Sequence, residues 1–127
     1  MNGSVTHFEI PVDDMARAQS FYRDAFGWRI DTIPDMNYTL VRTAPTDENG
    51  MPTQPGTVNG GMLPRGEPVL HSIVTITVDN VDSALATIES LGGKVVVGRT
   101  PAGAMGFTGY AKDTEGNVIG LWESAAS

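Results

Sequence analysis

The sequence repeats one structural pattern, and this repeat limits the folds that the chain can adopt. Each copy has a stretch of alternating apolar residues, a capped amphipathic helix and a glycine turn. The first copy spans Val5 to Trp28, and the second spans Ile73 to Lys94. Val12 and Val78 occupy matching positions 66 residues apart. The repeat predicts two similar structural modules within one chain.

The first strand of the repeat has two different faces. Phe8, Ile10 and Val12 point to one side of it and suit packing beneath a helix. His7 and Glu9 alternate with this apolar set, so they point to the opposite face. That face therefore carries two polar, titratable side chains.

The helix that follows has recognisable ends. Asp13 and Asp14 favour a helix N-terminus, and Gly27 suits the left-handed residue that often follows the last turn. Apolar residues between them recur at helical spacing and form one stripe. The stripe consists of Ala18, Phe21, Tyr22, Ala25 and Phe26, and its larger side chains, with Met15, are expected to lie in the core.

Further strands complete the two modules. In the first module they are expected at 28–33, 38–43 and 58–63, with Pro34 and Asp35 joining the first two. The glycine pair at 60–61 predicts a bulge or a close approach by another group. In the second module strands are expected at 94–97, 105–112 and 117–122, with a flexible loop over 101–106. The prediction is a single domain with module one at 4–63, a linker at 64–68 and module two at 69–124.

Composition excludes several classes of protein. The 127 residues include no cysteine, which rules out disulfides, thiolate metal sites and a cysteine nucleophile. A net charge of −7 with only 8 Lys and Arg argues against a nucleic-acid partner. The sequence has no apolar run long enough to span a membrane and no signal-peptide pattern, so we expect no membrane association and a cytoplasmic location.

Short motifs follow one another in a characteristic order along the two copies. They are His7 before Val12-Asp13-Asp14, Ser20-Phe21-Tyr22, Phe26-Gly27-Trp28, Val78-Asp79-Asn80-Val81, Leu91-Gly92-Gly93-Lys94-Val95 and the segment 113–122. Together they resemble the vicinal oxygen chelate (VOC) superfamily, which includes glyoxalase I, bleomycin-resistance proteins and extradiol dioxygenases. The resemblance implies an α+β fold in which two βαβββ modules form a half-open barrel around a central cavity. It also implies a homodimer, which would cover exposed sheet edges.

The resemblance implies a metal site of which this sequence keeps one position. Metalloenzymes of the superfamily bind the metal with a His or Gln on each first strand and a Glu on each last strand. His7 fills the first position, whereas the second module offers Ile73 and Gly120. The remaining position falls at Gly60 or Gly61. Catalytic metal sites usually have three protein ligands, so we expect no cofactor and disfavour a divalent metal.

Two acidic residues and a second histidine bear on this conclusion. His7, Glu9 and His71 have the ligand types of a facial triad and are an alternative, displaced metal site. Glu123 has the wrong strand parity relative to Gly120 to face the cavity. We expect Glu123 to be a solvated acid.

The remaining candidate residues concern a ligand site without metal. His7 and Glu9 are acid–base candidates, or else polar residues satisfied by hydrogen bonds in a polar cavity. Thr75 and Trp122 are expected to line the cavity, where Trp122 either stacks on a planar ligand or fills the space itself. Tyr38 and Arg42 share a strand face, and Arg42 either clamps an anionic substrate or pairs with an acid.

Three functions fit these residues. The first is a glyoxalase-like protein that binds a small molecule without the full metal site, as a binding protein or a tailoring enzyme. The second is a metal-dependent lyase, isomerase or dioxygenase of the glyoxalase type. The third is a drug-binding resistance protein of the bleomycin-resistance type. The identity of the ligand does not follow from the sequence.

Overall fold

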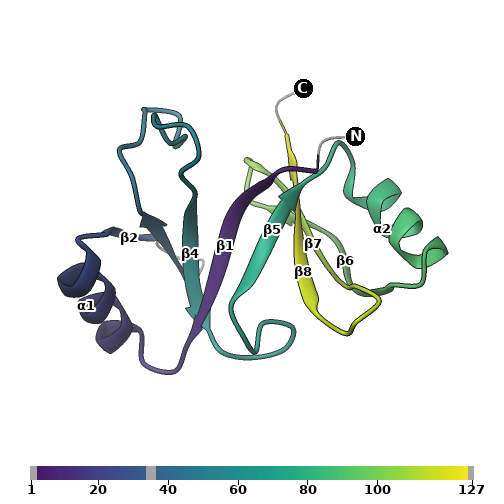
Figure 1. The fold of residues 1–127 in the computed structure, drawn as a ribbon, viewed down its shortest axis with the longest axis horizontal. Coiled ribbons are helices and arrows are strands. Elements are labelled where there is room, and N and C mark those ends of the chain that lie inside the picture. Colours follow the sequence, from purple (N-terminus) through teal and green to yellow (C-terminus); the bar gives the residue numbers. More distant parts are fainter. Residues whose placement is uncertain (1–2, 34–36, 126–127) are drawn as a thin grey trace. The chain divides into compact units, whose positions relative to one another are not determined.

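The computed structural model describes residues 3–33 and 37–125. This part of the chain forms eight strands and two helices in the order β1 (Val5–Val12), α1 (Met15–Phe26), β2 (Arg29–Ile33), β3 (Tyr38–Arg42), β4 (Asn59–Pro64), β5 (Ile73–Thr77), α2 (Val81–Ser90), β6 (Lys94–Ala102), β7 (Gly106–Lys112) and β8 (Val118–Ser124) (Figure 1). The order βαβββ therefore occurs twice. The predicted α+β fold of two βαβββ modules is confirmed. The predicted turn at Pro34 and Asp35 lies outside the described residues.

The two modules share one strand arrangement. In the first module the strand order is β2-β3-β4-β1, and β1 pairs in parallel with β4. In the second it is β6-β7-β8-β5, and β5 pairs in parallel with β8. The remaining neighbours in each module are antiparallel. A parallel pair needs a crossover connection, and the helix of each module lies within that connection.

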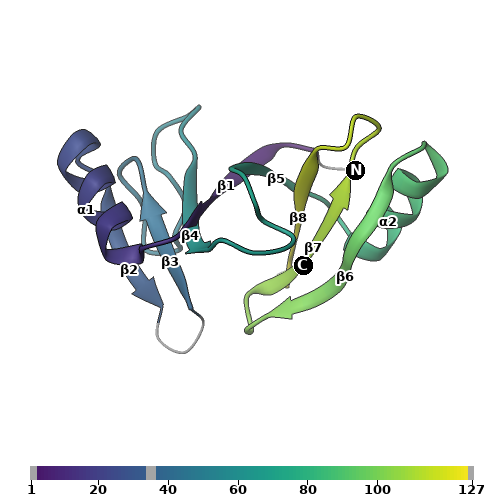
Figure 2. The same cartoon turned by 90° about the horizontal axis from the view of Figure 1, so that it is seen from below.

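Two compact units divide the chain close to these modules. One unit comprises His7–Ser72, and the other comprises the described residues up to Thr6 together with those from Ile73 onward. The start of β1 belongs to the second unit, and just before it the Ser4 carbonyl accepts a hydrogen bond from the Thr77 N–H at 2.9 Å. Figure 2 shows α1 beside the strands of its module and α2 beside those of the other. Neither helix in the described part of the chain is long and apolar enough to cross a membrane.

The core of the first module lies between α1 and its sheet. Val12, Val41 and Met62 are buried there. The side chains packed against them are Phe8, Ile10, Met15, Ala18, Tyr22, Trp28 and Ile30. The face predicted for Phe8, Ile10 and Val12 is therefore the helix-covered face of β1.

The helix buries less of its apolar stripe than the sequence predicts. Phe21 is 59% exposed and Phe26 is 62% exposed, so their assignment to the core is wrong. Phe21 lies at the edge of the stripe, and Phe26 is the last residue of α1. Both rings contact Tyr22, which stacks on Trp28 with 4.8 Å between the ring centroids. Phe26 also contacts Trp28, so the two exposed rings pack on this aromatic cluster and not in the buried core.

An ion pair between Arg99 and Glu123 lies on the helix-covered side of the second module, next to a core of Val78, Val81, Leu85, Ala111 and Leu121. Glu123 lies on the helix-covered face with the buried Leu121, which agrees with its predicted parity. The expectation that Glu123 is a solvated acid is wrong, because the residue is only 8% exposed and its carboxylate accepts hydrogen bonds from the protein. Its carboxylate accepts two hydrogen bonds from Arg99, at 2.8 and 3.0 Å. It also accepts one from the N–H of Val81, the first residue of α2, at 2.9 Å.

These bonds change the acidity of Glu123. Hydrogen bonds from Arg99, and then from the Val81 N–H, lower the pKa of Glu123 from 4.5 to about 2. Arg99 is held in turn by Phe107, whose ring centroid lies 3.5 Å from the guanidinium carbon. Arg99 lies on β6, which continues to Ala102 through part of the expected loop over 101–106. Pro101 is tolerated there because β6 is the edge strand of its sheet.

Replacing Glu123 with Gln tests this ion pair. Because the folded pKa lies below the ordinary value, the stabilisation by Glu123 is present above pH 4.5 and is lost as the pH falls towards 2. Glu123→Gln should therefore lower the melting temperature at pH 7 and reduce the loss of stability between pH 4.5 and 2. Circular dichroism melts across this range measure both effects. The exposed Glu89→Gln serves as control, and equal melting temperatures for Glu123→Gln and wild type at pH 7 would contradict the assignment.

Candidate functional site

The candidate site lies on the face of the first module's sheet that α1 leaves uncovered. On β1, His7 and Glu9 alternate with the residues that contact the helix, so they belong to this uncovered face. On β3, Val41 belongs to the core beneath α1. Tyr38 and Arg42 have the opposite parity and lie on the same face as His7. The structure thus places four of the predicted site residues on one surface.

Tyr38 reaches across the sheet to His7. The distance between His7 Nε2 and the Tyr38 hydroxyl oxygen is 2.8 Å, and the two rings are 16° from parallel. Strand β4 lies between β1 and β3, so the Tyr38 side chain passes over β4. Gly61 of β4 permits this passage, because a Cβ atom at Gly61 would overlap the Tyr38 phenol ring. The close approach predicted for the glycine pair is confirmed.

Burial controls the protonation of His7. Desolvation lowers the pKa of His7 below its ordinary value of 6.5, and the negative charge of Glu9 opposes this shift more weakly. His7 is therefore neutral at physiological pH, with one ring nitrogen donating and the other accepting hydrogen bonds. Glu9 is only 7% exposed and lies opposite Gly61 in the strand register. A neutral imidazole, a phenol and a buried carboxyl group thus occur together.

Arg42 is paired with an acid, as one of the two interpretations held. Its Nη1 donates to Asp31 Oδ2 at 2.9 Å. Arg29 Nε lies 3.3 Å from the same oxygen. The sequence reasoning missed Arg29 and Asp31, although the alternation of β2 places both on the face of Arg42. A search for charged residues opposite Arg42 would have found them.

Thr75 and Trp122 lie in the other unit, on the face of its sheet that α2 leaves uncovered. Thr75 is buried and pairs with Gly120, and a Cβ atom at Gly120 would lie 2.9 Å from Thr75 Oγ1. Thr75 therefore occupies much of the space expected to be open beside Gly120. The Trp122 ring lies against Gly106 of β7, where a Cβ atom would be 2.8 Å from Trp122 Cζ2. Trp122 is half-buried on its own sheet.

The register locates the positions that correspond to the metal ligands of the superfamily. Glu9 and Thr75 occupy matching positions of the repeat, 66 residues apart like Val12 and Val78. Glu9 pairs with Gly61 and Thr75 pairs with Gly120, so Gly61, and not Gly60, is the residue that matches Gly120. Neither glycine offers a ligand atom on a side chain. Within residues 3–33 and 37–125, no group of three or more His, Asp or Glu side chains is placed to hold a metal ion. His71, which is exposed, does not join His7 and Glu9 in such a group.

Comparisons with known proteins agree with this architecture. Residues 4–44 match the family described as bleomycin resistance protein-like N-terminal. A glyoxylase-like domain-containing protein of Didymella fabae is 31% identical over 99 residues, which are 74% of this chain and 72% of that protein. A candidate glyoxylase, CFP32, of Mycobacterium tuberculosis is 27% identical over 96% of this chain and 46% of its own length. The chain spans about half the length of this mycobacterial relative.

Solved structures support the fold. A methylmalonyl-CoA epimerase of Streptomyces coelicolor has a TM-score of 0.66, with 17% identity over 99% of this chain and 100% of the other. A hypothetical protein of Bacillus halodurans also has a TM-score of 0.66, with 10% identity over 100% of this chain and 98% of the other. The 31% identity to the Didymella fabae protein shows the family: the chain belongs to the vicinal oxygen chelate superfamily, in its glyoxalase-like part.

The lowered pKa of His7 predicts a specific dependence of stability on pH. Between the folded pKa and 6.5, the unfolded chain binds more protons than the folded chain, so stability rises with pH and levels off above about 6.5. Replacing His7 with Gln should remove this slope, whereas replacing the exposed His71 with Gln should preserve it. Chemical denaturation at a series of pH values from 5 to 8 measures the slopes. A wild-type slope unchanged in His7→Gln would show that His7 is not desolvated.

The contact over Gly61 predicts an unusual response to alanine. Glycine-to-alanine changes in compatible backbone stabilise proteins by up to about 1 kcal/mol. At Gly61 the overlap with Tyr38 should reverse the sign and destabilise the protein by roughly 1–3 kcal/mol. Gly98→Ala is the control, because a Cβ atom there meets no atom within 4 Å. Adding Tyr38→Ala to Gly61→Ala should cost less than the sum of the two single changes, and additive losses would contradict the contact.

Proposed function

We propose that the protein binds a small molecule on the uncovered face of the first module without the metal of the superfamily's enzymes. The observation that carries this proposal is the hydrogen bond between Tyr38 and His7 over Gly61. In a metalloenzyme of this superfamily, the last strand would project a Glu at the position of Gly61. Here the Tyr38 phenol fills that space and bonds the ring nitrogen of His7.

The donor set supports the same proposal. Besides His7, the corresponding positions hold Ile73, Gly61 and Gly120, which have no coordinating side-chain atoms. Catalytic metal sites usually supply three protein ligands. The residues present do not fit the superfamily's metal, and no chemical step is assigned to one.

Proton transfer is the chemistry that the remaining groups support. In the tautomer in which the His7 Nε2–H donates to the Tyr38 oxygen, Nδ1 of the neutral imidazole is the atom that can accept a proton from a ligand. Glu9 is a second titratable group next to them on β1. We therefore infer either a binding protein or a metal-independent enzyme whose acid–base residues are His7 and Glu9. Thr75 and Trp122 stay proposed ligand contacts of the second module, and a homodimer stays a prediction.

Metal content is the direct test of this proposal. Protein purified without chelator should contain only substoichiometric Ni, Zn, Fe and Mn by elemental analysis, because His7 lacks partner ligands. Dialysis against EDTA should leave the melting temperature unchanged. His7→Ala and His71→Ala should bind added Ni²⁺ as weakly as wild type does, with His71→Ala as the control for surface binding.

A different result would select another function. One metal ion per chain that survives dialysis and is lost in His7→Ala would favour a metal-dependent lyase, isomerase or dioxygenase. Tight binding of a cationic drug without turnover would favour a resistance protein.

A further inference from the structure

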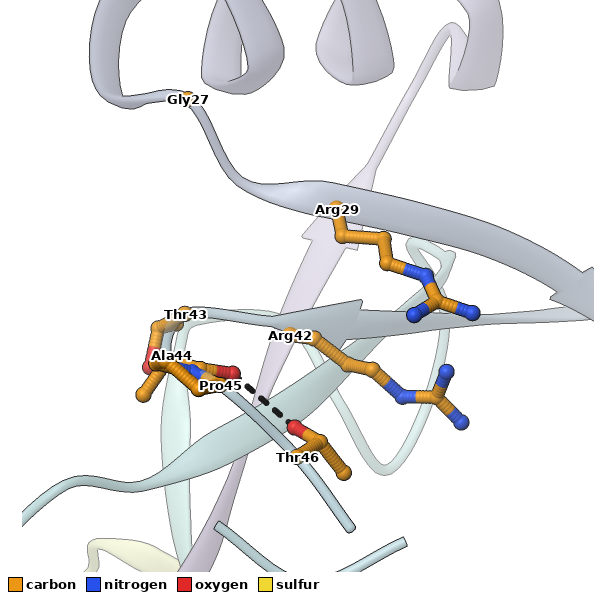
Figure 3. Close-up of a pocket in the computed structure, with 7 residues that line it drawn as sticks. All are labelled: Gly27, Arg29, Arg42, Thr43, Ala44, Pro45 and Thr46. Carbon is orange, nitrogen blue, oxygen red and sulfur yellow. Dashed lines mark hydrogen bonds between the residues drawn. The ribbon is translucent and has the colours of Figure 1, made fainter. Parts of the chain in front are cut away.

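A pocket of about 290 Å³ lies beside β2 and β3 of the first module. Its wall consists of Gly27, the side chains of Arg29 and Arg42, and the segment 43–46. Figure 3 shows the two arginine side chains extending in the same direction from neighbouring strands. They are the charged groups of this wall, so the pocket is cationic although the chain has a net charge of −7.

The strand register sets the two arginines opposite each other. Arg29 pairs with Arg42 across β2 and β3, and like charges in this arrangement repel. Asp31 Oδ2 lies between them, 2.9 Å from Arg42 Nη1 and 3.3 Å from Arg29 Nε. One carboxylate for two guanidinium groups leaves one net positive charge. Asp31 therefore holds the pair together without neutralising it.

Most of the donors on these two guanidinium groups are available to a ligand. A guanidinium group has five N–H donors, and within the described chain Arg42 uses one of them, on Nη1, in a hydrogen bond. The Arg42 side chain is 23% exposed and is held by Asp31, whereas that of Arg29 is 68% exposed. A planar fork held in this way suits the paired oxygens of a carboxylate or phosphate.

Asn59 connects this pocket to the His7 and Tyr38 pair. Asn59 pairs with His7 across β1 and β4, and the register of Val41 with Gly60 places Arg42 beside Asn59 on the other side. With strands about 4.8 Å apart, the backbones of His7 and Arg42 are about 10 Å apart across the sheet. The Asn59 side chain also accepts from Thr43 N at 2.9 Å and donates to Thr46 Oγ1 at 3.0 Å. It thereby fixes the loop that closes one side of the pocket.

We propose that Arg29 and Arg42 form a subsite for an oxyanion, so that the ligand is a small molecule carrying a carboxylate or a phosphate group. The anion lies on the free N–H donors of the two arginines, and the rest of the ligand extends over Asn59 towards His7 and Tyr38. The assignment of the anion to this ligand rests on the proposed function. The subsite itself rests on the pocket and its charges.

Isothermal titration calorimetry with inorganic phosphate and with acetate tests the subsite. Ionic strength is held constant with sodium chloride, so that only saturable binding registers. Wild type should bind at least one of the two anions saturably, and the preferred anion indicates whether the ligand carries a phosphate or a carboxylate. Arg42→Gln should weaken binding roughly tenfold or more, because it removes a charge-assisted hydrogen-bond donor. Arg29→Gln should weaken binding less, since its side chain is more exposed.

Two further variants make the test specific. Arg23→Gln, on the exposed side of α1, removes the same charge outside the pocket and should bind as wild type does. Arg42→Lys keeps the positive charge but lacks the planar guanidinium group with its paired N–H donors. This variant should bind the anion more weakly than wild type and more tightly than Arg42→Gln. Melting temperatures establish that each variant is folded.

Three results would overturn the subsite. They are no saturable binding of either anion to wild type, equal binding by Arg42→Gln and wild type, and equal weakening by Arg23→Gln and Arg42→Gln. Failure of the proposed function has a different signature, namely a stoichiometric metal lost in His7→Ala. The two outcomes are measured on separate variants and can therefore be told apart.

Discussion

The parallel pairing of the first strand with the last strand of each module is the constraint on which the structure depends. A parallel partner cannot be reached through a tight turn, so the chain must cross over between β1 and β4 and between β5 and β8. In each module the helix lies in this crossover and covers one face of the sheet. Once the helix covers one face, the alternation of β1 decides which of its residues become core and which stay on the uncovered face. Phe8 lies beneath the helix for this reason, and His7 and Glu9 do not.

Gly61 shows how an absent side chain determines a site. In the register of β1 and β4 it occupies the position at which enzymes of the superfamily place an acidic ligand. The missing side chain makes room for Tyr38, and the phenol brings a hydroxyl group within hydrogen-bonding distance of His7. An imidazole that burial keeps neutral then has a neutral partner. This combination suits hydrogen bonding to a ligand better than it suits holding a dication.

The sequence was sufficient to predict features that depend on periodicity and on residues close together along the chain. Alternation gave the two faces of β1, and the predicted cap residue Asp14 directly precedes α1. It failed where contacts between distant residues decide the outcome. Parity placed Glu123 away from the ligand face, but only the fold brings Arg99 and the start of α2 to it. The exposure of Phe21 and Phe26 likewise depends on how far α1 extends over its sheet. The hydrogen bond between Tyr38 and His7 crosses the intervening strand β4. The sequence pattern of a single segment does not predict such a contact between two strands.

The contact between Tyr38 and Gly61 also bears on how the site can change during evolution. An acidic side chain at position 61 would collide with the phenol as long as Tyr38 is present. Loss of Tyr38 alone would leave His7 without this hydrogen-bond partner. Each of these two changes is therefore expected to cost stability, so positions 38 and 61 constrain each other. A larger side chain at position 61 is therefore compatible with this backbone only where the phenol of position 38 is absent or turned away.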